Sequence, residues 1–227
     1  MATHKKVCDK VYQIGDPDMS APGDCSIYLL DVGNSESVMI DCGAGASFDQ
    51  LIKNIQSIGL KPEGVSALVL THCHIDHIGS AHLFKERLGC QIIAHKSDAD
   101  AIEGREPKST AAAWYGVEYV PVFIDKVITS EAEKARYGEV MLNFIHTPGH
   151  TPGSISVYCD IGGTRVLFGQ DIHGPFDASF GSDINAWKKS MGKLLELEAD
   201  ILCEGHFGVY RPKNKVKEYI EGYLSKY

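Results

Sequence analysis

The sequence has no long hydrophobic run and no cysteine pair in a C-x-x-C spacing. Its uninterrupted apolar runs are only a few residues long, as at 67–70, whereas a membrane-spanning helix needs about 20 apolar residues. The first 18 residues are polar and broken by charges, which is not the pattern of a secretory signal peptide. We therefore expect a cytoplasmic protein with no membrane contact.

Basic residues are also few. Lysine and arginine number 22 against 30 aspartates and glutamates, which gives a formal net charge of −8. Such a balance repels phosphate backbones and anionic lipid headgroups. Nucleic acid and membrane surfaces are therefore not the expected partners.

The seven cysteines are scattered along the chain, and their number is odd. Disulfide frameworks and cysteine zinc sites show clustered cysteines at characteristic spacings. We expect reduced thiols that serve as small core residues.

Strand and helix patterns alternate along the 227 residues. Short, mostly apolar runs predict strands at 26–31, 37–41, 65–70, 91–95, 140–145, 154–159, 165–169 and 201–203. Helical spacing of apolar residues predicts helices near 47–58 and 80–88, a third that carries Trp187, Met191, Leu194 and Leu195 on one face, and a last one that carries the apolar residues of 216–224. The charged segment 97–138 predicts helices and loops over one end of a sheet. We expect one α/β domain over residues 1–227, built from two packed halves.

Four residues that bind metals well follow the predicted strand at 65–70. They are His72, His74, Asp76 and His77. Imidazole nitrogens and carboxylate oxygens suit zinc and iron, and a loop at a strand end can direct alternate side chains to one point. A hydrophobic core would not hold this group without partners. The cluster therefore predicts a metal site.

Three further residues, His150, Asp171 and His206, also follow predicted strands. Functional groups of α/β proteins lie at such positions. Each residue alone also fits an ordinary role in a turn or loop.

The order of these motifs resembles the metallo-β-lactamase superfamily. The resemblance consists of H-x-H-x-D-H at 72–77, T-P-G-H-T at 147–151, Asp171, and Gly-His at 205–206, with Asp-Cys-Gly at 41–43. It extends over nearly the whole chain. It implies a four-layer αβ/βα sandwich with mixed sheets and a metal site along the edge where the two sheets meet.

The resemblance also implies a ligand set for two divalent metal ions, with zinc expected and iron or manganese as alternatives. It places His72, His74 and His150 on one metal, Asp76, His77 and His206 on the second, and Asp171 between the two. Asp41 would orient a ligand, as carboxylates beside metal ligands do.

Two such ions imply a hydrolase in which a metal-bridging hydroxide attacks the carbonyl of an ester, thioester or lactone. Asp76 would carry a proton away. Cys73 lies between two ligands and is expected to point away from the metals.

Individual residues favour particular branches of the superfamily. Asp171 disfavours the true β-lactamases, which usually lack that aspartate, and His74 disfavours flavodiiron oxidoreductases, which carry glutamate there. Glyoxalase II enzymes share all seven ligands, but their glycine- and arginine-rich segment after the aspartate is absent, as is their helical substrate domain after His206. A thioesterase or lactonase of similar type remains. The acidic charge disfavours RNA-processing members.

Two alternatives stay open. Persulfide dioxygenases resemble the chain at 71–74 and use one iron, held by the equivalents of His72, His150 and Asp171. They are disfavoured by the same missing segment after Asp171. A non-catalytic metal- or partner-binding module is the other.

Substrate contacts are expected around the loop after Asp171. His173, Phe176 and Phe180 lie in this loop, Tyr210 follows His206, and Trp114 and Tyr115 are expected to cap the site. His173 or Tyr210 would stabilise a developing oxyanion. The expected partner is a small-molecule substrate, and the resemblance is compatible with a homodimer.

Overall fold

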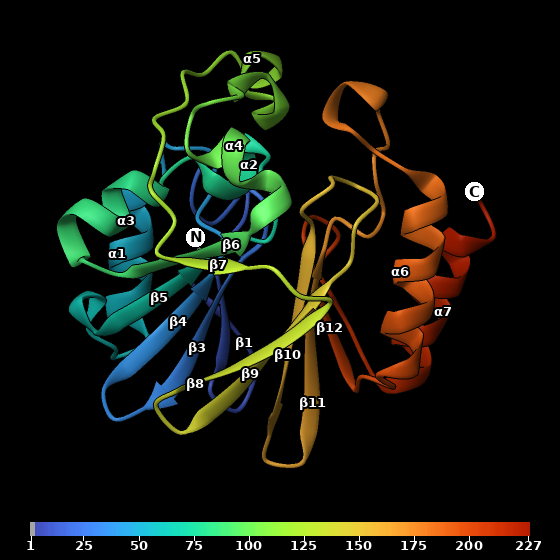
Figure 1. The fold of residues 1–227 in the computed structure, drawn as a ribbon. Helices are drawn as coiled ribbons and strands as arrows, with labels where there is room; N and C mark the ends of the chain where they lie inside the picture. Colours follow the sequence, from blue (N-terminus) through green and yellow to red (C-terminus); the bar gives the residue numbers. More distant parts are fainter. Residues whose placement is uncertain (1–2) are drawn as a thin grey trace.

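The computed structural model describes residues 3–227, and its strands form two mixed β-sheets (Figure 1). The first sheet has the order β1 to β7: Lys5–Cys8, Val11–Gly15, Ile27–Gly33, Glu36–Ile40, Val65–Val69, Gln91–His95 and Lys126–Ile128. Its first four strands pair antiparallel, and β4 to β7 pair parallel.

The second sheet has six strands in the order β13-β12-β11-β10-β9-β8. From β8 to β13 the strands are Ala132–Tyr137, Val140–His146, Ile155–Ile161, Thr164–Gln170, Ile201–Glu204 and Val209–Tyr210. Only β11 and β12 pair parallel within it; the other pairs are antiparallel. Strands β10 and β11, which match the strands expected at 154–159 and 165–169, form an antiparallel hairpin with Gly162 and Gly163 in its turn.

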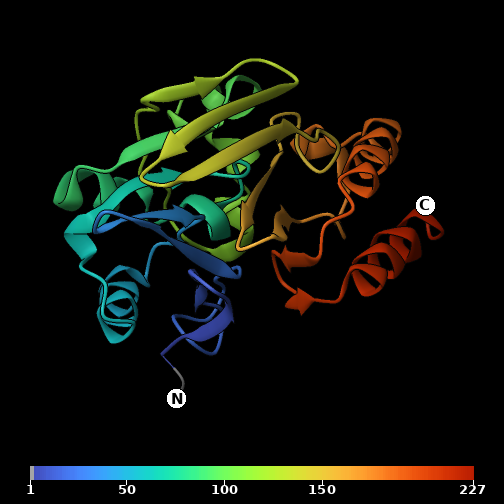
Figure 2. The same cartoon turned by 90° about the horizontal axis from the view of Figure 1, so that it is seen from below.

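Helices cover the outer face of each sheet. The α-helices α1 to α7 are Phe48–Ser57, Ile75–Ile78, Ala81–Leu88, Ala99–Ile102, Ala112–Tyr115, Ile184–Glu196 and Lys213–Leu224. Short 3-10 helices η1 to η4 lie at Pro62–Gly64, Lys96–Asp98, Pro107–Thr110 and Ala178–Phe180. Seen from below, α1 lies on one side of the sheets, and α6 and α7 lie on the other (Figure 2). The predicted α/β fold of four layers with mixed sheets is confirmed.

Strand alternation builds the cores between these layers. In β3, Leu29 points to the helix side while Tyr28 and Leu30 point to the other sheet, because successive side chains leave a strand on opposite faces. A central cluster therefore lies between the sheets, with Phe144 and Phe168 from the second one. Two outer clusters lie beneath the helices.

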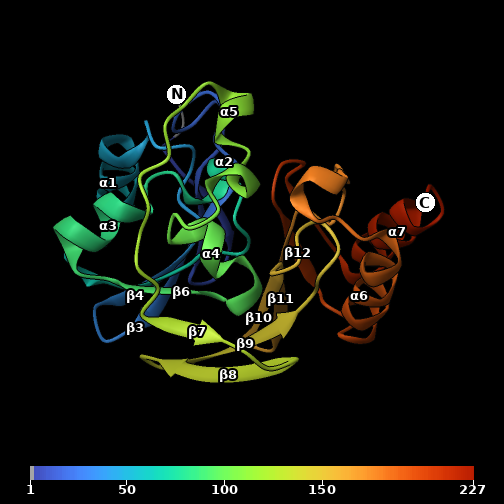
Figure 3. The same ribbon diagram turned by 45° about the horizontal axis from the view of Figure 1, so that its top comes forward.

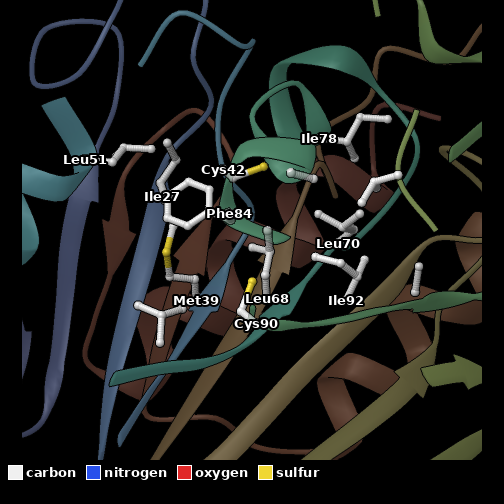
Figure 4. Packing of buried hydrophobic residues seen from close by; sticks show 14 of the residues in the cluster. Ile27, Met39, Cys42, Leu51, Leu68, Leu70, Ile78, Phe84, Cys90 and Ile92 are labelled. Carbon is white, nitrogen blue, oxygen red and sulfur yellow. The ribbon is translucent and has the colours of Figure 1, made fainter. Parts of the chain in front are cut away.

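The core beneath α1 and α3 fixes these helices on the first sheet. Phe84 of α3 packs among Ile27, Met39, Leu51 and neighbouring residues of this cluster (Figure 4). Its ring lies 4.9 Å from that of Phe48, in an edge-on arrangement. Helix α3 is therefore held close to the loop that carries the histidine cluster.

Two parts of the chain depart from the sequence predictions. Segment 97–138 contains the predicted short helices, but it also contains β7 and β8, which are strands. Strands β1 and β2 were likewise not predicted. Strands β1, β7 and β8 lie at sheet edges, and β1 and β8 carry exposed charged residues, as edge strands often do to prevent pairing with other chains. Strand β2 lies between β1 and β3 and is mostly buried.

The segments that carry the histidine cluster, α4 and α5 gather at one end of the sheets (Figure 3). The turn at η4 lies at the same end, and its Phe180 ring is 4.6 Å from the ring of Trp114 in α5. No helix in the described part of the chain is long and apolar enough to cross a membrane.

Candidate metal centre

The candidate ligands come from both sheets and meet at one end of them. His72 and His74 follow β5, and Asp76 and His77 lie in α2. From the second sheet, His150 follows β9, Asp171 follows β11, and His206 follows β12. All of them are buried except His206, whose side chain is 25% exposed. The structure thus brings together all seven residues that the motifs singled out.

His72, His74 and His150 form one group, whose ligand atoms lie within 4.8 Å of one another. His150 Nδ1 lies 2.8 Å from the carbonyl oxygen of Pro175 and can donate to it. That bond leaves Nε2 of His150 directed to the group, 2.9 Å from Nδ1 of His74. The three side chains can therefore present nitrogen lone pairs to one cation.

Asp76, His77 and His206 form a second group of the same size. His206 Nε2 lies 3.2 Å from Oδ2 of Asp76. His77 Nδ1 lies 2.8 Å from Oδ2 of Asp41, which also accepts the Thr71 hydroxyl at 2.7 Å. Asp41 is thus placed to accept a proton from Nδ1 of His77, which would leave Nε2 for a ligand role. That Asp41 orients a ligand stays a prediction.

Asp171 lies between the two groups. Its Oδ1 is 3.3 Å from His77 Nε2, and its Oδ2 is 3.3 Å from His206 Nε2 and 3.5 Å from His150 Nε2. Gly205 packs directly on this carboxylate, since a Cβ atom there would lie 2.2 Å from Oδ1. Only glycine leaves room for the aspartate in this position.

Despite these short distances, several buried polar atoms at the centre form no hydrogen bond of normal geometry with any group in residues 3–227. They are Nε2 of His72, His74 and His77, and Oδ1 of Asp171. Buried polar atoms are seldom left unpaired in folded proteins, and unpaired burial costs free energy. Imidazole nitrogens with carboxylate oxygens are the donors that divalent zinc or iron prefers. The residues therefore fit a bound divalent metal.

The electrostatics of the centre agree with this fit. Burial lowers the pKa of His72 well below its usual value and that of His74 to about 3, which keeps both imidazoles in the neutral form that binds metals. Burial also lowers the pKa of His206, but the Asp171 and Asp76 carboxylates outweigh it and raise the pKa to about 10. The carboxylates thus favour positive charge at the second group.

Asp98 supports two ligand loops and was not singled out from the sequence. Its Oδ2 accepts hydrogen bonds from the backbone N–H of Cys73 at 2.9 Å and from the Thr151 hydroxyl at 2.7 Å, and its Oδ1 accepts the N–H of Gly153 at 2.7 Å. The carboxylate is buried. Its position directly after a strand was the only signal available in the sequence.

Glu204 is a second supporting carboxylate that the motifs did not reveal. It is fully buried, and its Oε2 accepts the backbone N–H groups of His206 and Phe207 at 2.7 and 2.8 Å. Its Oε1 lies 2.6 Å from Nδ1 of His173. Glu204 therefore holds the His206 turn and orients His173.

A cavity of about 330 Å³ opens beside the ligands. Besides ligand side chains, it is lined by Ala111, Trp114, Tyr115, His173, Pro175, Phe180 and Phe207. Four of the side chains expected near the substrate therefore face this cavity: His173, Phe180, Trp114 and Tyr115. Cys73 points away, as expected, and its thiol lies 3.3 Å from the carbonyl of Ser109.

Two expected contacts lie elsewhere. Strand β13 folds back on β12, so Tyr210 pairs with Leu202 and its ring lies 3.9 Å from that of Tyr219 in α7. Phe176 packs against Trp187, with the two rings 5.1 Å apart. Tyr210 is therefore not among the residues that line the cavity, because the antiparallel turn carries its ring to the helix layer. That it contacts substrate stays an untested prediction.

Comparison with known proteins decides the family. A profile described as "Metallo-beta-lactamase superfamily" matches residues 20–206. The chain belongs to the metallo-β-lactamase superfamily. The matched range contains all seven candidate ligands.

Relatives in the metallo-β-lactamase superfamily include proteins from bacteria and archaea. An uncharacterised protein of Aquifex aeolicus is 30% identical over 178 residues, which cover 78% of this chain and 75% of that protein. A probable metallo-hydrolase of Methanocaldococcus jannaschii is 25% identical over 174 residues, 77% of this chain and 76% of its own. A probable metallo-hydrolase of Bacillus subtilis is 27% identical over 176 residues, 74% of each chain.

Solved structures of the superfamily share the fold. A metallo-β-lactamase from Cronobacter sakazakii superposes with a TM-score of 0.82 at 19% identity and covers 99% of this chain and 92% of its own. A class B3 di-zinc metallo-β-lactamase from an Alaskan soil metagenome gives 0.80 at 21% identity, with 98% and 90% covered. At this identity the similarity is one of fold.

Proposed function

We propose that the protein is a dinuclear metal-dependent hydrolase, most similar to the glyoxalase II and lactonase branch, that cleaves an ester, thioester or lactone of a small molecule. The proposed ligands are His72, His74 and His150 for one ion, Asp76, His77 and His206 for the second, and Asp171 for both. Zinc is the expected metal, with iron or manganese as alternatives.

The main support for this proposal is the position of Asp171 between the two groups of ligands. Its two oxygens lie within 3.5 Å of nitrogens from both groups, so this one carboxylate is placed to serve two cations. Two divalent ions held this closely would supply an activated water and a polarised carbonyl group. No serine or cysteine nucleophile is then needed.

The chain's own residues would hold the substrate and move protons. Asp76 uses Oδ2 towards His77 and His206, and we propose Oδ1 as the atom that takes up a proton during hydrolysis. His173, oriented by Glu204, is the polar side chain proposed to contact the substrate oxygen that gains charge. Replacement of Asp76 by Asn with full metal content and full turnover would remove Asp76 from this role.

Two relatives support hydrolysis, because they are named probable metallo-hydrolases. A persulfide dioxygenase with one iron on His72, His150 and Asp171 is the alternative, and it predicts a different metal count. A small-molecule substrate, a homodimer, a cytoplasmic location and the lack of nucleic-acid or membrane partners stay predictions.

Metal content per chain tests the proposal directly. Protein purified without oxygen and without added metal should contain about two zinc ions, or zinc plus iron, per chain by elemental analysis. His77→Ala or His206→Ala should lower this content, whereas His82→Ala, on the outer helix α3, should not. About one iron per chain that survives loss of His77 and His206 would instead assign the dioxygenase. A panel of lactones, esters and thioesters then identifies the scissile bond.

A further inference from the structure

The cavity beside the candidate metal centre has two aromatic walls. On one side, the Trp114 ring lies 4.6 Å from Phe180, and Phe180 lies 4.6 Å from His74. A second row of rings lines the same cavity, in which Phe207 lies 4.6 Å from His173 and His173 lies 5.4 Å from His206. Each wall therefore runs from an outer aromatic ring to a proposed metal ligand.

The outer ring of each wall is exposed. Trp114 is 64% exposed and Phe207 is 56% exposed, although large apolar side chains usually bury much of their surface. The two rings come from distant parts of the chain, α5 and the turn after β12. They line the same cavity, so an apolar group placed there would cover both of them.

In the described part of the chain, the same cavity has no basic side chain that could form an ion pair with a distal negative charge. None of the described residues that line it is lysine or arginine. Apart from the ligand carboxylates and histidines, the lining consists of apolar or aromatic side chains and His173. Placing an anionic substituent between the outer aromatic rings, at the end of the cavity away from the proposed metal ligands, would remove part of its hydration with no lysine or arginine beside it.

We propose that the site selects substrates whose acyl group is uncharged, flat and apolar, such as an arylacetyl group, and rejects acyl groups that carry a distal carboxylate. The aromatic walls hold the ring of the acyl group, and the scissile carbonyl lies towards the ligands. This inference rests on the proposed hydrolase function and adds its substrate class.

Binding of two matched amides tests the inference without hydrolysis. Phenylacetamide and its 4-carboxy derivative differ only in a charge at the far end of the ring, away from the carbonyl group. Calorimetric titration of the purified, metal-containing protein should show about tenfold or more tighter binding of the neutral amide, a ratio that corresponds to about 1.4 kcal/mol. Equal or tighter binding of the charged amide would overturn the proposal.

Variants of the two aromatic walls test whether Trp114 and Phe207 are responsible for the binding of phenylacetamide. Trp114→Ala and Phe207→Ala should each weaken binding of phenylacetamide by about five- to tenfold, since each removes one aromatic contact. Phe123→Ala is the matched control: Phe123 is 68% exposed but lies outside the cavity lining, so its loss should leave binding unchanged. Wall variants that behave like the control would also overturn the proposal.

Hydrolysis separates this inference from the proposed function. Phenylacetyl and (4-carboxyphenyl)acetyl thioesters of N-acetylcysteamine share the leaving group, and kcat/KM should favour the neutral acyl group by about tenfold or more. Turnover that favours the charged thioester would leave the hydrolase function standing and reject the substrate class. The expected amide selectivity in a protein that cleaves no ester, thioester or lactone would reject the function and keep the binding preference.

Discussion

Asp98 and Thr151 join the two loops that carry the candidate ligands of the first group. The Thr151 hydroxyl donates to Oδ2 of Asp98 at 2.7 Å, and the same oxygen accepts the backbone N–H of Cys73. One buried carboxylate thus ties the loop of His72 and His74 to the loop of His150. This bond, together with the backbone bond from Ile155 N–H to the Thr71 carbonyl at 2.9 Å, holds the two loops side by side.

Asp98→Asn should therefore lower both stability and metal affinity. The side-chain amide of the variant would direct an N–H group at hydrogen-bond donors that the carboxylate now binds. Each buried donor left unpaired costs about 1–3 kcal/mol. We expect a loss of about 2–4 kcal/mol in the free energy of unfolding, measured by urea denaturation. Asp100→Asn, at an exposed ion pair with Arg105, is the control and should change little. A variant as stable as the control would contradict the supporting role.

Asp41→Asn tests how the second group is oriented. Asp41 Oδ2 holds the proton of His77 on Nδ1 at 2.8 Å, and loss of such a partner typically lowers metal affinity by about 10- to 100-fold. Competition for zinc with a chromophoric chelator measures the change. Asp49→Asn, a surface aspartate whose side chain is 86% exposed, should bind zinc as the unmodified protein does. Unchanged affinity in Asp41→Asn would show that His77 keeps its orientation by other means.

Gly205→Ala should displace Asp171, because the new Cβ would lie 2.2 Å from Oδ1 of that carboxylate. We expect a folded protein whose bound metal falls well below that of the unmodified chain, measured by elemental analysis with circular dichroism as the check on folding. Gly222→Ala is the matched control. Gly222 lies in α7, and no atom lies within 4 Å of a Cβ placed there. This change should stabilise the protein by about 0.5–1 kcal/mol. Full metal content in Gly205→Ala would contradict the bridging position of Asp171.

The free energy of unfolding should depend on pH through His95, which is not one of the candidate ligands. Burial, followed by the His146 ring stacked 3.8 Å away, lowers the pKa of His95 to about 4, and its Nδ1 accepts the N–H of Ser97. The unfolded chain, with a pKa near 6.5, therefore binds this proton more readily than the folded protein. The free energy of unfolding then falls as the pH drops from about 6.5 to about 4.

His95→Asn should remove this contribution. Between pH 7 and pH 5, the unmodified protein should lose about 2 kcal/mol more of its unfolding free energy than the variant does. Urea denaturation of both proteins at the two pH values measures the difference. Identical losses would show that His95 takes up no proton on unfolding in this range.

The parts of the fold that the sequence predicted are those with strong periodic patterns. The strands near 27–31, 65–69 and 155–159 and the helix ending before Gly89 were all expected, because their apolar residues recur with the period of a strand or a helix. Strand β8 was missed, since its sequence AEKARY is mostly polar and none of its residues is fully buried. Edge strands are defined by their neighbours, which the sequence does not display.

The same limit applies to the candidate site. Tyr210 is close to His206 along the chain, yet the antiparallel pairing of β13 with β12 moves it to the helix layer. Asp98 and Glu204 were not singled out because their importance comes from hydrogen bonds to backbone groups of other loops. Such partners carry no side-chain signature.

The sequence by itself determined which side chains could bind metals and their order along the chain, because the spacing of histidines and aspartates after strands is a local property. Only the tertiary structure decided that these residues converge, that Asp171 lies between two groups, and that aromatic rings from α5 and the turn after β12 face one cavity. The reason is that both sheets contribute to the site. Distances between their strand ends are set by packing of the central core, which depends on residues far apart in the chain.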